Sequence, residues 1–195
     1  LNLLSCERGS IMSVIEKEKV NLRQSLQSMF DDHIDLVESM RSYDEDIMAF
    51  AQVMVDSLMQ GGGIYWYGNG GSAADAQHMA AELVSRFKLE RKALRSQALT
   101  TDTSILTAIG NDYSFGDIFK RQVEATVRPR DVCIGLSTSG NSDNVCQGHI
   151  AARNAGATTL SLLGNDGGKI NEVSDHAIII PSMISRTQFI HRSNK

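Results

Sequence analysis

Between residues 64 and 180 the chain alternates short apolar runs with segments of helical character, and this alternation limits the possible folds more than any other feature. Each run has the length and composition of a buried strand. Right-handed crossovers place such strands in one parallel sheet with helices on both faces. The sequence therefore predicts an α/β fold with a doubly wound five-stranded parallel sheet. The predicted strands are residues 64–67, 97–101, 132–136, 158–163 and 177–180.

Residues 13–60 precede this pattern and carry apolar residues at helical spacing within a sequence rich in Glu, Gln, Leu, Met and Lys. We expect two amphipathic helices with a break at residues 42–44, the second ending at the glycines of 61–63. Because Met12 is a plausible start, we expect residues 1–12 to be a non-native or disordered extension. Residues 13–195 are then expected to form a single domain.

Composition excludes several classes of function. A net charge of -4 argues against a nucleic-acid partner held by clustered Lys and Arg. No apolar run approaches the roughly 18 residues that span a bilayer, so no membrane partner is expected. The 3 cysteines form neither a zinc-binding pair nor a disulfide framework, which favours a reducing compartment. We therefore expect a cytoplasmic protein.

Two loops rich in Ser and Gly follow the first and third predicted strands, GNGGS at 68–72 and STSGNS at 137–142. In doubly wound sheets ligands bind where the strand order reverses, commonly between these two strands. Glycine lets the backbone approach an anion, helix N-terminal N–H groups donate to it, and hydroxyls add neutral donors. Each loop alone could be a tight turn with a serine N-cap. Together they favour a phosphate monoester site.

A dinucleotide site is an alternative, because Gly68, Gly70 and Ala73 satisfy the relaxed fingerprint of such sites after a strand. That fingerprint also needs an acidic residue about 20 positions further on. Asp102 follows a predicted strand but lies too far along. The second Ser-rich loop is also unexplained by a dinucleotide, so a nucleotide-dependent oxidoreductase rests on the glycines alone.

The helix after GNGGS carries Asp75, His78 and Glu82 on one face, because they are spaced three and four residues apart. A His/Glu pair at this spacing can supply two zinc ligands, and a carboxylate can abstract a proton next to a carbonyl. A solvated polar stripe is the alternative. The alanines around the pair predict a close-packed helix whose polar face lines a cavity. We expect structural roles for His33, His149 and His176.

Three stretches of the sequence strongly resemble the phosphoheptose isomerases, which belong to the sugar-isomerase (SIS) domain class. They are GNGGSAADAQHMAAEL at 68–83, RKALRSQALTTDTSILTAIGNDYSFGDIFKRQVEA at 91–125 and STSGNSDNV at 137–145. The resemblance implies a flavodoxin-like SIS domain preceded by an N-terminal helical hairpin, in a homotetramer with active sites between subunits. It implies conversion of sedoheptulose 7-phosphate to D-glycero-D-manno-heptose 7-phosphate, for bacterial heptose-nucleotide and cell-surface glycan synthesis, including that of lipopolysaccharide.

The resemblance also assigns roles to individual residues. His78, Glu82 and Gln188 would bind one Zn²⁺ per subunit, which would polarise the substrate carbonyl. Glu82 would also be the catalytic base that moves a proton between adjacent sugar carbons through an enediol. The residues implied to contact substrate are Asn69, Gly70, Gly71, Ser72, Glu82, Arg86, Asn111, Asp112, Ser137, Thr138, Ser139, Ser142 and Gln188.

The carboxyl end departs from the family pattern, which continues past the glutamine into a long helix with a second histidine. The sequence ends at Lys195, so we expect a truncated C-terminal helix and a fourth protein ligand of zinc absent from this chain. The remaining ligands predict a weaker site, which puts the activity of this chain in question. A non-catalytic SIS module that binds sugar phosphates or a replication initiator is the alternative. The presence of both His78 and Glu82 favours the enzyme.

Overall fold

The computed structural model describes residues 3–180 of the chain, with side chains from residue 21 onward. It divides into two compact units, Leu1–Asp44 and Glu45–Lys195. The first unit holds helix α1 (Leu3–Ser39) and the 3₁₀ helix η1 (Met40–Tyr43), and α2 (Asp44–Met59) follows.

The two predicted helices and the break between them are confirmed. Helix α1 begins at Leu3 and so includes residues 3–12, for which we expected no helix; their native or non-native origin stays a prediction. Within residues 3–180, every helix is too short or too polar to cross a bilayer.

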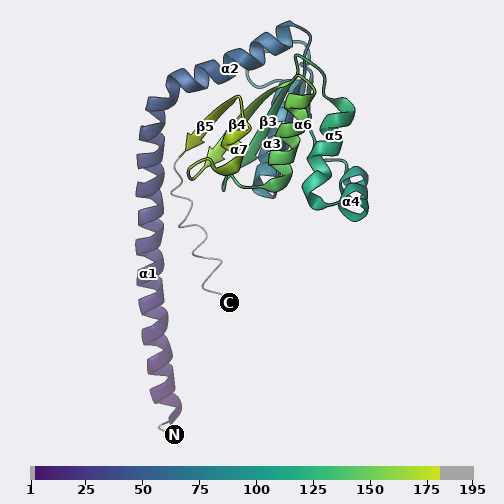
Figure 1. Ribbon diagram of the computed structural model, residues 1–195. Helices are drawn as coiled ribbons and strands as arrows, with labels where there is room; N and C mark the ends of the chain where they lie inside the picture. The colour runs from purple at the N-terminus through teal and green to yellow at the C-terminus, as the bar shows by residue number, and fades with distance from the viewer. Residues whose placement is uncertain (1–2, 181–195) are drawn as a thin grey trace. The chain divides into compact units, whose positions relative to one another are not determined.

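The second unit contains a parallel five-stranded sheet with strand order β2-β1-β3-β4-β5 (Figure 1). All five predicted strands are confirmed. Strand β2 is shorter than predicted because the chain turns at Leu99 and Thr100. Asp102 then caps the next helix by accepting from Ile105 N, at 2.9 Å. The bounds are β1 Ile64–Gly68, β2 Ser96–Ala98, β3 Val132–Ser137, β4 Thr158–Gly164 and β5 His176–Ile180.

Strand β1 pairs with β2 on one side and with β3 on the other, so the strand order reverses at β1 as the sequence predicted. Side chains alternate between the two faces of the sheet. Tyr65, Tyr67 and Cys133 join the apolar core beneath α5 and α6, while α3 lies on the opposite face (Figure 1). The helices between strands are α3 Gly71–Val84, α4 Thr103–Asp112, α5 Ile118–Thr126, α6 Asp143–Asn154 and α7 Gly168–Glu172, with the 3₁₀ helix η2 at Phe115–Asp117.

A buried chain of hydrogen bonds runs through this core from β1 to α7. Tyr67 Oη lies 2.6 Å from His149 Nδ1, and His149 Nε2 lies 2.7 Å from Ser161 Oγ. Ser161 Oγ lies 2.7 Å from Ser174 Oγ, which donates to Ile170 O at 2.7 Å. Because the chain ends on a carbonyl, each hydroxyl upstream must donate toward it. Tyr67 therefore donates to His149, and His149 carries its proton on Nε2.

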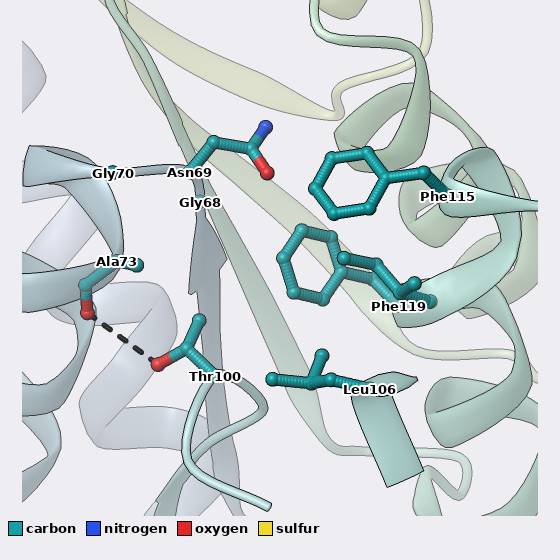
Figure 2. A pocket seen from close by; sticks show the side chains of 9 residues that line it. Gly68, Asn69, Gly70, Ala73, Thr100, Leu106, Phe115 and Phe119 are labelled. Carbon is teal, nitrogen blue, oxygen red and sulfur yellow. Dashed lines mark hydrogen bonds between the residues drawn. The ribbon is translucent and has the colours of Figure 1, made fainter. Parts of the chain in front are cut away.

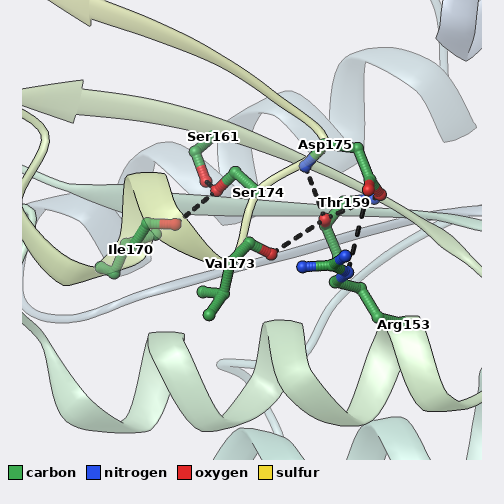
Figure 3. A network of polar contacts seen from close by, with 7 residues as sticks. All are labelled: Arg153, Thr159, Ser161, Ile170, Val173, Ser174 and Asp175. Atoms are coloured by element: carbon green, nitrogen blue, oxygen red, sulfur yellow. Dashed lines mark hydrogen bonds and ion pairs between the residues drawn. The ribbon is translucent and has the colours of Figure 1, made fainter.

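A second polar network joins the edge strand β5 to β4 (Figure 3). The Asp175 carboxylate accepts hydrogen bonds from Thr159 N at 2.8 Å and from Thr159 Oγ1 at 2.9 Å. Arg153 Nε on α6 lies 3.8 Å from the same carboxylate. Ser174, the preceding residue, belongs to the chain of hydrogen bonds from His149 and donates to Ile170 O (Figure 3). The residues that follow α7 are therefore tied to β4 through both networks.

The neutral His149 makes the fold sensitive to acid. Burial lowers the pKa of His149 from 6.5 to about 4, so between these values the unfolded chain binds more protons than the folded one. The free energy of unfolding therefore falls by up to roughly 3 kcal/mol as the pH drops from 6.5 to about 4. We expect His149→Leu to be less stable at neutral pH but to lose most of this pH dependence, measured by urea unfolding between about pH 7 and pH 4.

His176→Gln is the control, because it removes an exposed imidazole outside the buried chain. An unchanged slope of stability against pH in His149→Leu would contradict the assignment.

Candidate active site

The two Ser/Gly loops meet at the carboxyl edge of the sheet, as the sequence predicted. Gly68, the first residue of the first loop, pairs with Leu136, the residue before the second loop, in the β1–β3 register. Asn69 and Asn144 then join the first loop to α6 by a reciprocal pair of amide hydrogen bonds, each 2.8 Å long. The structure therefore places both loops in one site.

The first loop leaves the N-terminus of α3 without a side-chain cap. Gly70 is the N-cap residue, with a φ of 56° that favours glycine. Ser72 N donates to Asn69 O at 3.0 Å, which closes the turn. Because glycine has no side-chain oxygen, no side chain caps this end of the helix. Ala73 N and Ala74 N both donate to Gly70 O, at 3.1 and 3.2 Å. The glycine backbone of this turn lets an external anion approach closely.

The second loop also leaves the helix that follows it without a side-chain cap. Ser142 is the N-cap of α6, but its hydroxyl makes no capping bond and lies 3.1 Å from Ser137 Oγ instead. Ser137 Oγ also lies 3.5 Å from Ser139 Oγ, so three hydroxyls gather in this loop. Thr138 is exposed beside them. The loop thus offers neutral donors and a helix terminus with no side-chain cap.

The second loop is held tightly against the connection between β4 and α7. Gly140 has a φ of 68°, and a Cβ there would lie 2.3 Å from the backbone of Gly167. Ile170 N donates to Gly140 O at 3.0 Å, and Lys169 N donates to Asn141 Oδ1 at 3.2 Å. The support for this loop therefore comes from α7, the element at which the His149 chain ends.

A cavity of about 160 Å³ opens beside the first loop (Figure 2). Gly68, Asn69 and Gly70 form one wall, and the side chains of Phe115 and Phe119 face Asn69 from the other side. Phe115 is 65% exposed at the mouth. The remaining lining residues are Ala73, Thr100, Leu106 and Ile118.

The His/Glu pair lies on the second half of α3, where His78 Nε2 is 3.2 Å from Glu82 Oε1. The expectation that this face lines an interior cavity is wrong for the single chain. The His78 side chain is 74% exposed and that of Glu82 31%, because Ala76 and Ala80 take the buried face of the helix. Asp75 is exposed on the outer side as well.

The donor pair suits zinc, since a neutral imidazole and a carboxylate at i,i+4 are typical ligands of this ion. Between residues 21 and 180, no three His, Cys, Asp or Glu side chains gather closely enough to hold a metal. Gln188, the third predicted ligand, lies outside the described residues. The described part of the chain therefore contains two of the three predicted zinc ligands, His78 and Glu82.

Three predicted substrate contacts lie away from the cavity. Arg86 follows the end of α3 and pairs with Glu90 at 3.2 Å. Asn111 and Asp112 end α4, with Asn111 Nδ2 donating to Asp112 Oδ1 at 2.8 Å. Asp112 lines a separate hollow between α4 and α5. Within residues 21–180 no hydrogen bond joins these three side chains to the two loops.

Two residues of the site were missed in the sequence. Asn144 is almost fully buried and fixes Asn69, although it lies in the STSGNSDNV stretch immediately after the serines. Its position on the first turn of a helix was the available signal. Phe115 belongs to the connection after α4, where the sequence predicted no site residue, and only the fold brings it to the first loop.

Comparisons with known proteins agree with this geometry. The SIS domain family model matches residues 29–164. The phosphoheptose isomerase of Aquifex aeolicus is 54% identical over 140 residues, covering 72% of this chain and 73% of that protein.

Two solved structures are also similar. The phosphoheptose isomerase of Neisseria gonorrhoeae superposes with a TM-score of 0.78 at 40% identity, over 87% of this chain and 92% of that one. The enzyme of the same name from Francisella tularensis has a TM-score of 0.79 at 32% identity, over 85% and 90%.

The amide pair of Asn69 and Asn144 predicts energetic coupling between the loops. Each single alanine substitution leaves the other amide without its partner, at a cost of roughly 1–3 kcal/mol. Since the double substitution removes both amides, it should cost less than the sum, with an interaction energy of about 1 kcal/mol in urea unfolding. The control is the pair Gln77→Ala and Asn144→Ala. These side chains share no partner, so the stability costs of the two substitutions should add. Additive effects for Asn69 and Asn144 would contradict the coupling.

Proposed function

We propose a specific reaction for this chain on one premise: it belongs to the SIS-domain family and, within it, to the phosphoheptose isomerases. It is therefore an isomerase. The proposed reaction converts sedoheptulose 7-phosphate to D-glycero-D-manno-heptose 7-phosphate, an exchange between a ketose and an aldose. The observation that carries this proposal is the meeting of the two loops beside a helix that presents a paired histidine and carboxylate.

The two loops are the proposed site of the phosphate and the sugar hydroxyls. The first turns of α3 and α6 lack side-chain caps. The proposed donors to phosphate oxygens are the amides that begin α6, while the glycine backbone before α3 lets the anion approach closely. Ser137, Ser139 and Ser142 add hydroxyl donors at the second helix. Hydroxyls and amides hold an anion without bringing a permanent charge. This suits reversible binding of a phosphate monoester.

Glu82 is the proposed base. Its carboxylate takes a proton from C1 of the ketose, and the electrons of that bond form the C1–C2 double bond of an enediol. The π electrons of the C2 carbonyl move to its oxygen, which takes up a proton and becomes a hydroxyl. The same carboxylate returns the proton to C2 while the C1 hydroxyl loses its proton and becomes the aldehyde. The net result moves hydrogen between adjacent carbons and between their oxygens, with no external oxidant. His78, 3.2 Å away, holds the carboxylate on the same face of α3.

Zinc is the proposed metal, and His78, Glu82 and Gln188 are its proposed ligands. When bound, zinc supplies Lewis acidity that stabilises negative charge on the substrate oxygens. Residues 1–180 of the sequence contain the first two of these ligands.

The alternatives are less well supported. A nucleotide-dependent oxidoreductase is excluded by membership of the isomerases, and the Asp102 carboxylate is engaged in capping α4. A non-catalytic sugar-phosphate-binding module, or one that associates with a replication initiator, would have no use for a paired His78 and Glu82. Turnover distinguishes it from the enzyme, because a module binds the sugar phosphate without isomerising it.

We also propose that the protein is a cytoplasmic homotetramer whose product enters bacterial heptose-nucleotide and cell-surface glycan synthesis. The exposed position of His78 supports an active site completed by a neighbouring subunit. Helix α1 supports assembly as well, because an apolar stripe along it is exposed and contiguous stripes of this kind mark interfaces. The exposed members of the stripe are Leu22, Leu26, Met29, Phe30, Ile34 and Val37.

Replacement of the base tests the mechanism. We expect Glu82→Gln to lower kcat for sedoheptulose 7-phosphate by about 10²–10⁴-fold, because the amide cannot accept the proton. Glu124→Gln on the exposed side of α5 is the control and should keep the parent rate. Thermal shift with sedoheptulose 7-phosphate checks that the Glu82→Gln variant still folds and binds. Full activity of this variant would exclude the Glu82 carboxylate as the base.

Disruption of the α1 stripe tests the assembly. We expect the parent protein to run at four times its chain mass of 21.3 kDa in light scattering after gel filtration. Phe30→Glu should shift it to a smaller species, since a charge in an apolar interface is costly to bury. Asp35→Glu, on the same helix, should leave the mass unchanged. A parent protein that runs as a monomer would refute the tetramer.

A further inference from the structure

We propose that Arg91 is a positioning residue for Glu82: its guanidinium caps the C-terminus of α3 and so holds the turn that carries the catalytic carboxylate. The inference rests on the proposed function of Glu82. Arg91 lies outside the helix, nine residues along the chain from Glu82. It was not among the residues that the sequence predicted for the site.

One guanidinium group reaches four backbone carbonyls. Arg91 Nη2 donates to Glu82 O at 2.7 Å, and Nη1 donates to Leu83 O at 2.8 Å. Nη1 also lies 3.2 Å from Ser85 O and 3.0 Å from Lys92 O. Two of these carbonyls belong to the last turn of α3, including that of Glu82 itself. The planar fork of arginine fits this arrangement, whereas a single ammonium group cannot occupy both ends of the fork.

The last turn of a helix needs such support, because its final four carbonyls have no partner within the helix. Glu82 lies two residues before the end of α3 at Val84. A cation at this end also interacts favourably with the helix dipole. Leu94 N donates to Leu83 O at 3.1 Å, so the segment after Arg91 is tied to the same turn.

The carboxylate depends on this backbone support because it has little side-chain support. Within residues 21–180, His78 is the single side chain that hydrogen-bonds Glu82, and it is exposed and lies on the same helix. Among these residues, no hydrogen bond or ion pair from another element therefore fixes the carboxylate directly. A frayed last turn would move it relative to the substrate loops, and a misplacement of about 1 Å can cost about 10²-fold in rate.

The chain offers a matched control. Arg128 also caps the C-terminus of a helix, α5, through fewer bonds: Nη2 donates to Ala125 O at 3.0 Å and Nη1 to the C-cap carbonyl, Val127 O, at 2.8 Å. Helix α5 carries none of the residues proposed as catalytic or as substrate contacts, and its two cavity-lining residues, Ile118 and Phe119, lie at its other end. Removal of either guanidinium should lower stability through loss of a cap, but only Arg91 should affect turnover.

The test compares the full chain with Arg91→Ala, Arg91→Lys and Arg128→Ala, well below their melting temperatures. We expect Arg91→Ala to lower kcat for sedoheptulose 7-phosphate at least tenfold with KM changed less than threefold. The kcat of Arg91→Lys should lie between those of Arg91→Ala and the parent. Added methylguanidinium should partly restore the kcat of Arg91→Ala. The Tm of Arg128→Ala should fall by a similar amount, while its kcat should stay within twofold of that of the parent. A kcat loss in Arg91→Ala no greater than that in Arg128→Ala would overturn the proposal.

A second readout separates this inference from the proposed function. Ser85 N donates the final hydrogen bond of α3, to Ala81 O at 2.8 Å, so hydrogen exchange of the Ser85 amide reports on the last turn. Exchange should accelerate at least tenfold in Arg91→Ala and stay unchanged in Arg128→Ala. An inactive parent protein would refute the proposed reaction alone. Unchanged Ser85 exchange in Arg91→Ala would refute the role of Arg91 whatever the parent catalyses.

Discussion

The parallel pairing of β1 with both β2 and β3 is the constraint on which the rest of the structure depends. Strand β1 is hydrogen-bonded on both sides. The chain leaves β1 for α3 on one face of the sheet, and it leaves the neighbouring strand β3 for α6 on the other face. The ends of these two strands are adjacent, so both loops and two helix N-termini meet there. The site is therefore a consequence of strand order, and the residues of the loops refine what it binds.

The buried chain of hydrogen bonds that begins at Tyr67 connects the sheet to the supports of both loops. Tyr67 is the residue before Gly68 and the first loop, and its hydrogen bond to His149 ties β1 to α6. The chain continues through β4 to α7, which in turn holds Gly140 of the second loop. Burial raises the pKa of Tyr67 and lowers that of His149, so both stay neutral near pH 7. Two loops that are far apart in sequence thus share one rigid support.

The two ends of helix α3 lie in different surroundings. Its first turn follows the glycine loop of the proposed anion site, while its last turn presents Glu82 on an outer face. Such a face is well suited to completion by a second subunit, but it leaves the carboxylate with little side-chain support in its own chain. The cap from Arg91 supplies order at that end through the backbone.

The sequence by itself determined the strands, their order, the place of both loops and the family. Apolar runs and glycine positions depend on neighbours along the chain, and the family motifs are local as well. Only the tertiary structure decided that Asn144 holds Asn69, that Phe115 faces the first loop, that His149 is neutral and that Arg91 reaches Glu82. It also reversed the expectation that the His78 face is interior, because Ala76 and Ala80 occupy that side. These are contacts and burial between segments distant in sequence, and no local pattern specifies them.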